Sequence, residues 1–340
     1  KYSYTLVFGQ GEQGFKPDGS HDDNLLQIKY SVDAENWNAA GNEDLGMGGG
    51  FERPLQPLIY TTNRAKNIKI INKAELCKSV IFNGKEYIQT GMESGPITIY
   101  GWSFNEVYIT FKEGITNFSD AFYGCDALTE IPENLFANCP KVNTFFQTFA
   151  LCKSLKSIPT GLFAHNPEVT DFSGTFMDCS TLKSIPENLF ANCPKVTDFS
   201  ETFDGCAKLT SIPENLFANC PKVTVFGGTF SECKALIAIP KGLFVHNPKV
   251  TDFEQTFDGC EALKSIPAGL FDNNRKVSDF SYTFYGCSAL TGESPYTMIG
   301  DQKVHIYERN NYLYIFSKIE NRTGTFSGCN GLTDLQSNSI

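Results

Sequence analysis

A cysteine recurs every 27 residues through the second half of this chain of 340 residues, and this period constrains the fold more than any other feature. Phenylalanine, leucine, isoleucine, valine and proline recur in columns that keep step with the cysteines. A fixed period of about 20–50 residues is the signature of supersecondary units that stack on one another. The cysteines of this column are Cys125, Cys152, Cys179, Cys206, Cys233, Cys260 and Cys287.

The repeat unit reads C-x-x-L-x-x-I-P-x-x-L-F-x-x-[CNH]-P-x-V-x-x-F-x-x-T-F-x-x-C. Its stretches L-x-x-I and V-x-x-F favour short strands. Pro186 followed by Glu187 is typical of a helix start, and Ser200 is suited to a helix N-cap. One unit cannot fold alone: about eight apolar side chains offer roughly 2 kcal/mol each on burial, against about 1.5 kcal/mol for each ordered residue. Stacking of units must supply the missing burial.

The pattern V-T-D-F-S-x-T-F-x-x-C-x-x-L-x-x-I-P resembles the bacterial BspA-like leucine-rich repeat, in which A-F-x-x-C or M-F-x-x-C precedes L-x-x-I. The resemblance covers roughly residues 114–340. It implies a curved solenoid on the cell surface, often secreted or lipid-anchored, that binds host proteins, cells or matrix. The period of 27 residues is longer than that of many family units, and the additional residues fall in N-L-F-A-N-C-P.

We therefore predict an α/β solenoid, a leucine-rich-repeat-type right-handed stack of 27-residue units made of short strands and short helical turns, preceded by a small β-rich N-terminal domain. The predicted division is a β-rich domain at 1–96, the solenoid at 97–290, and an irregular repeat with a cap at 291–340. The spacing from Cys287 to Cys329 exceeds one period, and "KVHIYE" and "YLYIF" in this insertion predict an extra hairpin.

Strands are expected in the N-terminal domain where apolar and polar residues alternate, at 2–8 and 25–32. "SVIFNGKEYI" (79–88) indicates a hairpin, because Asn83-Gly84 matches a type I′ turn. Further strands are expected at "PLIYTT", "NIKII", "ITIY" and "VYITF".

The cysteine column predicts reduced, buried thiols, because free cysteine packs as a small hydrophobe and disulfide geometry is demanding. A second set, Cys139, Cys193 and Cys220, alternates with Asn166, Asn247 and Asn274 in other repeats. A required disulfide partner would not alternate with asparagine. No C-x-x-C or compact Cys/His quartet is present, so we predict no structural metal in the repeats.

Repeated residues also argue against an enzyme. His165 and His246 stand in a column that is asparagine elsewhere. An aspartate column breaks at Val225 and Thr144, which favours turn-forming acids over a calcium stripe. We expect a flexible loop at "GNEDLGMGGGF" (41–51), and the cluster Asp18, His21, Asp22 and Asp23 lacks EF-hand spacing, with a metal site there as the lesser alternative. We predict no catalytic residues, no cofactor and no metal.

A net charge of −10 argues against nucleic acid and anionic bilayers as partners, because both need clustered Lys and Arg. No window is long and apolar enough for a membrane-spanning segment. The chain begins at Lys1 without a Met, which leaves room for a lipid anchor upstream.

Candidate binding residues are those that depart from their column toward apolar side chains. Phe146 stands where other repeats have serine, Leu151 replaces glycine, and Met177 replaces aspartate. A second group departs in the same way, with neutral drift between repeats as the alternative explanation for both groups. The second group consists of Val225, Ile237 and Ala238.

The leading hypothesis is a non-enzymatic scaffold, secreted or on the outer surface of a bacterium, that binds an extracellular or host protein and serves in adhesion. The alternative is a carbohydrate-binding accessory surface protein. Trp37 and Trp102, outside the regular repeats, could hold a sugar ring or pack in a core. An enzyme site in the N-terminal domain is the third and weakest hypothesis.

Overall fold

A computed structural model describes residues 57–63, 66–82, 85–86, 95–101 and 104–335, together with β1 (Gly14–Phe15) and β2 (His21–Asp22), which pair antiparallel. Contacts between residues divide the chain into two compact units, Lys1–Arg53 and Pro54–Ile340. The predicted strands at 2–8 and 25–32, the loop at 41–51, both tryptophans and the side chains of the acidic cluster lie outside the described residues. The predicted domain limits at 96 and 290 stay predictions.

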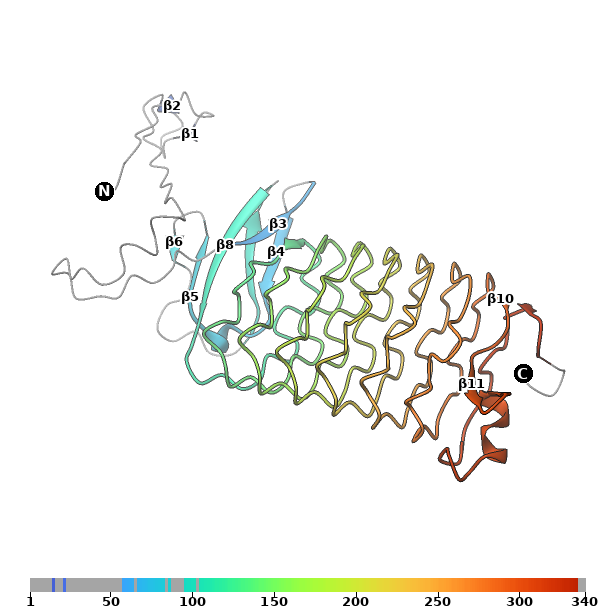
Figure 1. Cartoon of the computed structure of the whole chain (residues 1–340). Coiled ribbons are helices and arrows are strands. Elements are labelled where there is room, and N and C mark those ends of the chain that lie inside the picture. The colour runs from blue at the N-terminus through green and yellow to red at the C-terminus, as the bar shows by residue number, and fades with distance from the viewer. Residues whose placement is uncertain are drawn as a thin grey trace, which may run out of the picture. The chain divides into compact units, whose positions relative to one another are not determined.

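Six strands between residue 58 and the first repeat, β3 to β8, confirm the strands expected at PLIYTT, NIKII, ITIY and VYITF (Figure 1). Together with β9 they form a five-stranded sheet in the order β6-β5-β8-β3-β9 and a separate pair, β4 with β7. β5 and β6 are antiparallel, as the hairpin prediction requires, although the turn between them lies outside the described residues. The elements are β3 (Leu58–Thr61), β4 (Lys66–Ile71), a 3₁₀ turn η1 (Ala74–Leu76), β5 (Cys77–Phe82), β6 (Lys85–Glu86), β7 (Ile97–Gly101), β8 (Phe104–Phe111) and, within the first repeat, β9 (Leu128–Glu130).

The N-terminal strands and the repeats share one hydrophobic core. Phe111 at the end of β8 lies edge-on to Phe118, with ring centroids 4.7 Å apart, and stacks on Phe136 at 6.0 Å. The buried hydroxyl of Tyr60 donates to the carbonyl of Ile70 at 2.6 Å. The strands therefore cover the first repeat, whose apolar face would otherwise be open to water.

Each repeat lies on the next through backbone hydrogen bonds (Figure 1). Alternate N–H groups reach the following repeat: Phe118 donates to Thr144 at 3.1 Å and Phe122 to Thr148 at 2.8 Å. The N–H groups between them close turns within their own repeat, as when Ala121 donates to Phe118 at 3.0 Å. Parallel single-residue bridges join the successive positions Asn117, Thr144, Asp171, Asp198, Val225, Asp252, Asp279 and Asn321.

The predicted helical turns are wrong in detail, because no α-helix occurs among the described residues. An α-helix would direct each N–H to the carbonyl four residues earlier in its own chain segment. In the turn before each cysteine of the 27-residue column, alternate backbone N–H groups instead donate to the neighbouring repeat. Only hydrogen-bonded turns therefore form there. Among the L-x-x-I stretches only the first forms a strand, β9. Near the end of the stack, β10 (Thr291–Gly292) pairs in parallel with β13 (Gly331–Leu332).

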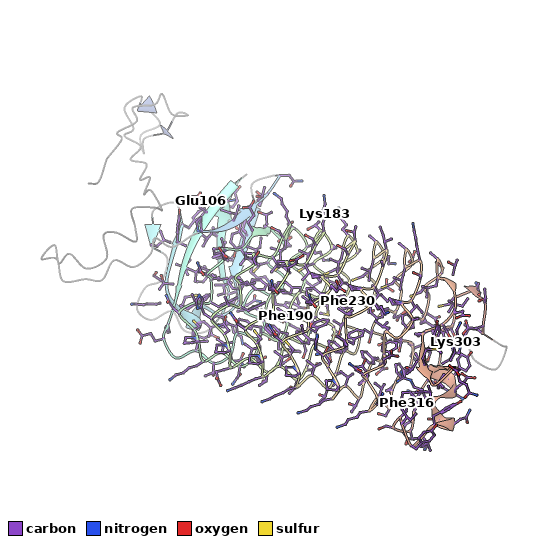
Figure 2. All side chains as sticks on the ribbon, in the orientation of Figure 1. Glu106, Lys183, Phe190, Phe230, Lys303 and Phe316 are labelled. Atoms are coloured by element: carbon purple, nitrogen blue, oxygen red, sulfur yellow. The ribbon has the colours of Figure 1, made fainter. Side chains whose placement is uncertain are left out.

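The phenylalanine columns fill the interior of the stack (Figure 2). The ring of Phe190 has its centroid 4.7 Å from those of Phe172 and Phe199, and it stacks at 6.1 Å on Phe163 and at 6.2 Å on Phe217. Aromatic pairs of this kind add about 0.5–1.5 kcal/mol beyond their buried area. The rings therefore bind each repeat to both of its neighbours.

Buried polar groups pair with the preceding repeat. The hydroxyl of Thr175 bonds to the carbonyls of Phe172 at 2.7 Å and Phe145 at 3.0 Å. The thiol of Cys152 donates to the carbonyl of Phe122 at 3.2 Å. All twelve cysteines are free and buried, which confirms the prediction of a reduced thiol column. Burial raises the pKa of the Cys193 thiol to about 12, so it is protonated and unreactive at neutral pH.

The second cysteine set alternates with asparagine because both side chains donate to the same two kinds of carbonyl. Asn166 donates through Nδ2 to Phe136 at 3.2 Å and Cys139 at 2.9 Å. Cys220 donates through its thiol to Phe190 at 3.7 Å and Cys193 at 3.5 Å. Either residue therefore supplies a hydrogen-bond donor to these carbonyls of the preceding repeat.

The last of the predicted segments, 291–340, contains a hairpin of β11 (Tyr296–Ile299) and β12 (Gln302–His305), followed by the 3₁₀ helix η2 (Ile306–Asn311). We call residues 291–335 the C-terminal cap. "YLYIF" (312–316) is not a strand, which corrects the predicted hairpin: it forms a turn after η2. The reason is that Phe316 is buried against the guanidinium of Arg309, which lies 4.4 Å from its ring.

Candidate functional site

The turn that precedes each cysteine of the 27-residue column lies along one face of the stack, and one position in it has positive φ in every copy. Glycine favours that conformation, and glycine occupies the position in most copies. A longer side chain in one copy lies over glycine in the next: a Cβ on Gly205 would collide with the carboxylate of Asp178, and one on Gly259 with Glu232. The glycines therefore leave room for their neighbours. The position is held by Gly124, Leu151, Asp178, Gly205, Glu232, Gly259 and Gly286.

The first predicted group lies on this turn face. Phe146 is 39% exposed, and its N–H donates to the hydroxyl of Thr144 at 3.0 Å. Leu151 is half-buried at φ 59°, and its N–H donates to the carbonyl of Met177 at 2.7 Å. Hydrogen bonding thus brings Leu151 and Met177 together on adjacent repeats, and Phe146 lies at the start of the same turn as Leu151.

The second predicted group is divided between two ladders. Val225 is half-buried in the bridge ladder, between Asp198 and Asp252. Ile237, 45% exposed, belongs to another ladder: its N–H donates to Thr210 at 3.3 Å. Ala238, next along the chain, is exposed. A binding role for these residues and for the first group stays a prediction.

Acidic residues follow Met177 along the turn face. Burial, and then repulsion from Asp178, Glu201 and Glu232, raises the pKa of Asp204 to about 6, although a hydrogen bond with Ser231 opposes the shift. Within the described residues no three potential metal ligands converge. In the bridge ladder, Asp198 accepts hydrogen bonds from the N–H of Ser200 at 2.8 Å and from its hydroxyl at 2.5 Å, which is a turn-forming role.

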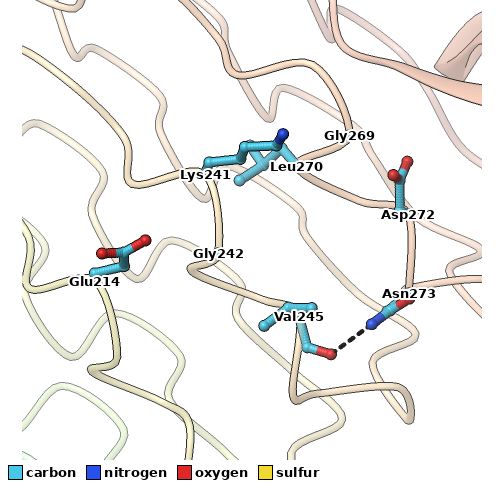
Figure 3. Close-up of a pocket in the computed structure, with 8 residues that line it drawn as sticks. All are labelled: Glu214, Lys241, Gly242, Val245, Gly269, Leu270, Asp272 and Asn273. Carbon is cyan, nitrogen blue, oxygen red and sulfur yellow. Dashed lines mark hydrogen bonds between the residues drawn. The ribbon is translucent and has the colours of Figure 1, made fainter.

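A groove of about 330 Å³ opens on another part of the repeats (Figure 3). Gly242 and Gly269 contribute to it, at positions where other repeats have the asparagine of P-E-N-L-F. Asn273 borders it and donates to the carbonyl of Val245 at 2.8 Å. Its charged side chains have both signs, and no serine, cysteine or histidine lines it, so it offers no nucleophile and base pair. The groove is lined by Glu214, Lys241, Gly242, Val245, Gly269, Leu270, Asp272 and Asn273.

A serine, a histidine and an aspartate meet in the C-terminal cap. The hydroxyl of Ser294 donates to Asp334 at 2.5 Å and lies 2.9 Å from Nδ1 of His305, and that same nitrogen lies 3.1 Å from Asp334. A catalytic triad needs the serine and the acid on opposite nitrogens of the imidazole. This arrangement therefore fastens residue 334 to the cap.

Two groups in the cap were not singled out by the sequence. Arg309 donates to the carbonyls of Asn274 at 3.2 Å and Phe271 at 3.0 Å, as the next member of the Cys/Asn column would. The signal that could have found it is the end of that column at Asn274. Tyr314 is the other, and it is 79% exposed.

Residues 77–197 and 102–224 match the model of the BspA type leucine-rich repeat region, with six copies. This part of the chain therefore belongs to the BspA-type leucine-rich repeat family, as the motif predicted. None of the curated proteins matches the chain. None of the helices in the described part of the chain has the length and apolar character needed to cross a bilayer.

Among solved structures, the chain is similar to the Toll–Spätzle complex of Drosophila, with 16% identity over 61% of this chain and 31% of the other, at a TM-score of 0.22. It is also similar to a leucine-rich cell surface protein of Faecalibacterium prausnitzii, with 18% identity over 65% of this chain and 77% of the other, at a TM-score of 0.18. The chain thus spans about a third of the Toll structure's chain.

Proposed function

We propose that this chain is a non-enzymatic binding scaffold, a right-handed solenoid secreted by a bacterium or displayed on its outer surface, that binds an extracellular or host protein. The observation that carries the proposal is the exposure of Phe146 and Ile237 in columns that are polar in most other repeats. Isolated large apolar side chains on a rigid, hydrogen-bonded frame are suited to serve as anchors in an interface. Binding of proteins is also the common use of leucine-rich repeats.

Two further observations support a binding role. The interior polar side chains of the threonine and Cys/Asn columns bond to backbone carbonyls of the preceding repeat. The interior therefore has little chemistry to offer a substrate. The varied side chains lie on the outside, where a partner would meet them.

The test measures binding of the whole chain, immobilised on a biosensor, to a panel of fibronectin, fibrinogen, laminin, collagen and mucin. We expect at least one protein to bind, and Phe146→Ser or Ile237→Thr to weaken that binding at least about tenfold. Val245→Ala is the matched control: Val245 is exposed too, but the change restores the alanine found in most other repeats. Lack of binding across the panel, or an equal loss in Val245→Ala, contradicts the proposal.

The second candidate function is carbohydrate binding, favoured by one specific observation. Tyr314 in the cap is 79% exposed, and the ring and hydroxyl of a tyrosine together suit a ligand that is apolar on one side and polar on the other.

A further inference from the structure

Residues 311–318 form a loop that is closed at its base, and we call it the tyrosine loop. The side chain of Asn310 holds both backbone groups of Ile319: its Oδ1 accepts the N–H at 2.7 Å and its Nδ2 donates to the carbonyl at 3.1 Å. Within the loop, the N–H groups of Ile315 and Phe316 both donate to the carbonyl of Tyr312, at 2.9 and 3.1 Å. The loop backbone is therefore fixed by its own hydrogen bonds.

A buried arginine ties the tyrosine loop to the end of the stack. Arg309 is 3% exposed, donates to the carbonyls of Phe271 and Asn274, and lies against the ring of Phe316 in the loop. Its Nε has no hydrogen-bond partner among the described residues, and the charge of Asp272 favours its protonated form. Burying a cation in this way is costly. Here it holds the loop in one place, and such departures from ordinary packing are expected at functional sites.

The tip of the loop is exposed and apolar. Leu313 is 56% exposed and Tyr314 79%, and the rings of Tyr312 and Tyr314 lie 6.2 Å apart at 45°. The hydroxyl of Tyr312 is oriented by Gln302, at 3.1 Å from its Oε1. A terminal segment that only closes a stack has a polar outer face. Closure of the stack therefore does not explain the exposure of Tyr314, which indicates a role in binding a ligand.

The charges of the loop and of β12 are already paired. Lys318, the charged residue of the loop, pairs with Glu320 at 2.9 Å. Lys303 of β12 pairs with Glu293 at 2.5 Å, and Nδ1 of His305 lies 3.1 Å from Asp334. An anionic or cationic ligand would have to break these pairs. The free chemistry is two aromatic faces with hydroxyl and amide groups beside them, which is suited to the C–H face and the hydroxyls of a neutral sugar.

We propose that Tyr312 and Tyr314 form a binding site for a neutral polysaccharide. The proposal rests on the second candidate function, carbohydrate binding, and gives it a site. It is independent of protein binding at Phe146 and Ile237, because it uses neither residue.

The experiment is native affinity electrophoresis of the whole chain in gels that contain dextran, pullulan, galactomannan or xyloglucan. We expect at least one of these neutral polysaccharides to retard the chain. Tyr312→Ala with Tyr314→Ala should weaken the retardation at least about tenfold. Tyr314→Phe, which keeps the ring, should remain within about threefold. Both rings are exposed or half-exposed, so we expect the variants to fold. Their melting temperatures check this.

Tyr100→Ala is the matched control: this tyrosine is 69% exposed on β7, among the N-terminal strands, and its loss should leave retardation unchanged. Four results each overturn the proposal: no retardation by any neutral polysaccharide, equal retardation of the double variant, retardation by polygalacturonate alone, or binding only to phosphatidylcholine vesicles. Phe146→Ser separates the two proposals, since it should weaken protein binding and leave retardation unchanged.

Discussion

The regular repeats and the C-terminal cap both supply hydrogen-bond donors to buried backbone carbonyls, but they use different residues. In the repeats, the backbone carbonyls of the Cys/Asn column accept a hydrogen bond from the equivalent residue one copy later, as Cys193 does from Cys220 and Cys220 does from Asn247. In the cap, the same kind of carbonyl at Asn274 is satisfied by Arg309, which has no equivalent elsewhere. The repeats are thus redundant in their polar contacts and dependent on ring stacking, whereas the cap depends on a few unique residues.

The largest expected effect is loss of one ring from the middle of the stack. Phe190→Ala removes a buried side chain that contacts rings in both neighbouring repeats, and we expect it to lower the free energy of unfolding by about 3–5 kcal/mol. Urea denaturation measures the change. Phe146→Ala, at an exposed phenylalanine, is the control and should stay within about 0.5 kcal/mol. Similar losses in the two variants would mean that ring stacking does not hold the repeats together.

The second effect tests the uniqueness of the cap. Arg309→Leu leaves the buried carbonyl of Asn274 without a donor and removes the side-chain donor to the carbonyl of Phe271, which keeps the N–H of Asn274. We expect a loss of about 2 kcal/mol after the relief of a buried charge is included. Hydrogen exchange should rise in residues 311–319. Asn274→Cys, the matched change in the repeats, repeats a natural alternation and should cost less than about 1 kcal/mol. An equal cost for the two changes would remove the distinction between the regions.

The third effect distinguishes the cap by its pH dependence. Burial raises the pKa of Asp334, but hydrogen bonds from Ser294 and the proximity of His305 outweigh this and lower it below its usual value. A depressed pKa stabilises the fold above the unfolded value near 3.9, and this contribution is lost as pH falls through the folded pKa. We expect Asp334→Asn to cost about 1–2 kcal/mol at pH 7 and progressively less below about pH 4. Melting curves against pH measure this.

Glu320→Gln provides the control for Asp334→Asn, because Glu320 forms an exposed pair with Lys318 and should contribute less than about 1 kcal/mol at any pH. A cost for Asp334→Asn that is constant from pH 7 to pH 3 would show that the carboxylate charge does not stabilise the cap.

The periodic residues made most of the repeat architecture predictable. Where two residue types replace one another in a column, their role is interior or structural. The exchange of Cys220 and Asn247 therefore predicted free, buried cysteines. The helical turns did not follow, because a single unit does not reveal that its N–H groups bond to the next one. The cap was least predictable: the role of Arg309 depends on carbonyls left over more than thirty residues earlier.

The candidate site divides in the same way. Column comparison found Phe146 and Ile237, because departures from a repeated pattern are visible in sequence, and their exposure agrees with that reasoning. It could not find Tyr314, because the tyrosine loop has no column to depart from. Exposure there is set by Asn310 and Phe316, which hold the loop through contacts that no periodicity records.

The smallest expected effect concerns Leu151, which departs from its column as the residues of the cap depart from the repeats. Leu151 has φ of 59°, a conformation that costs an L-residue about 1–2 kcal/mol, in a column where glycine is common. Glycine loses more entropy on folding and gives up the leucine's partial burial, so we expect Leu151→Gly to raise the free energy of unfolding by only about 0.5–1 kcal/mol. Gly205→Ala is the reverse change and should destabilise, because its Cβ would meet Asp178. If Leu151→Gly gains stability and weakens protein binding, the strain at this turn is maintained for binding. A loss of stability would instead show that leucine is retained for packing, as the other residues of the regular repeats are.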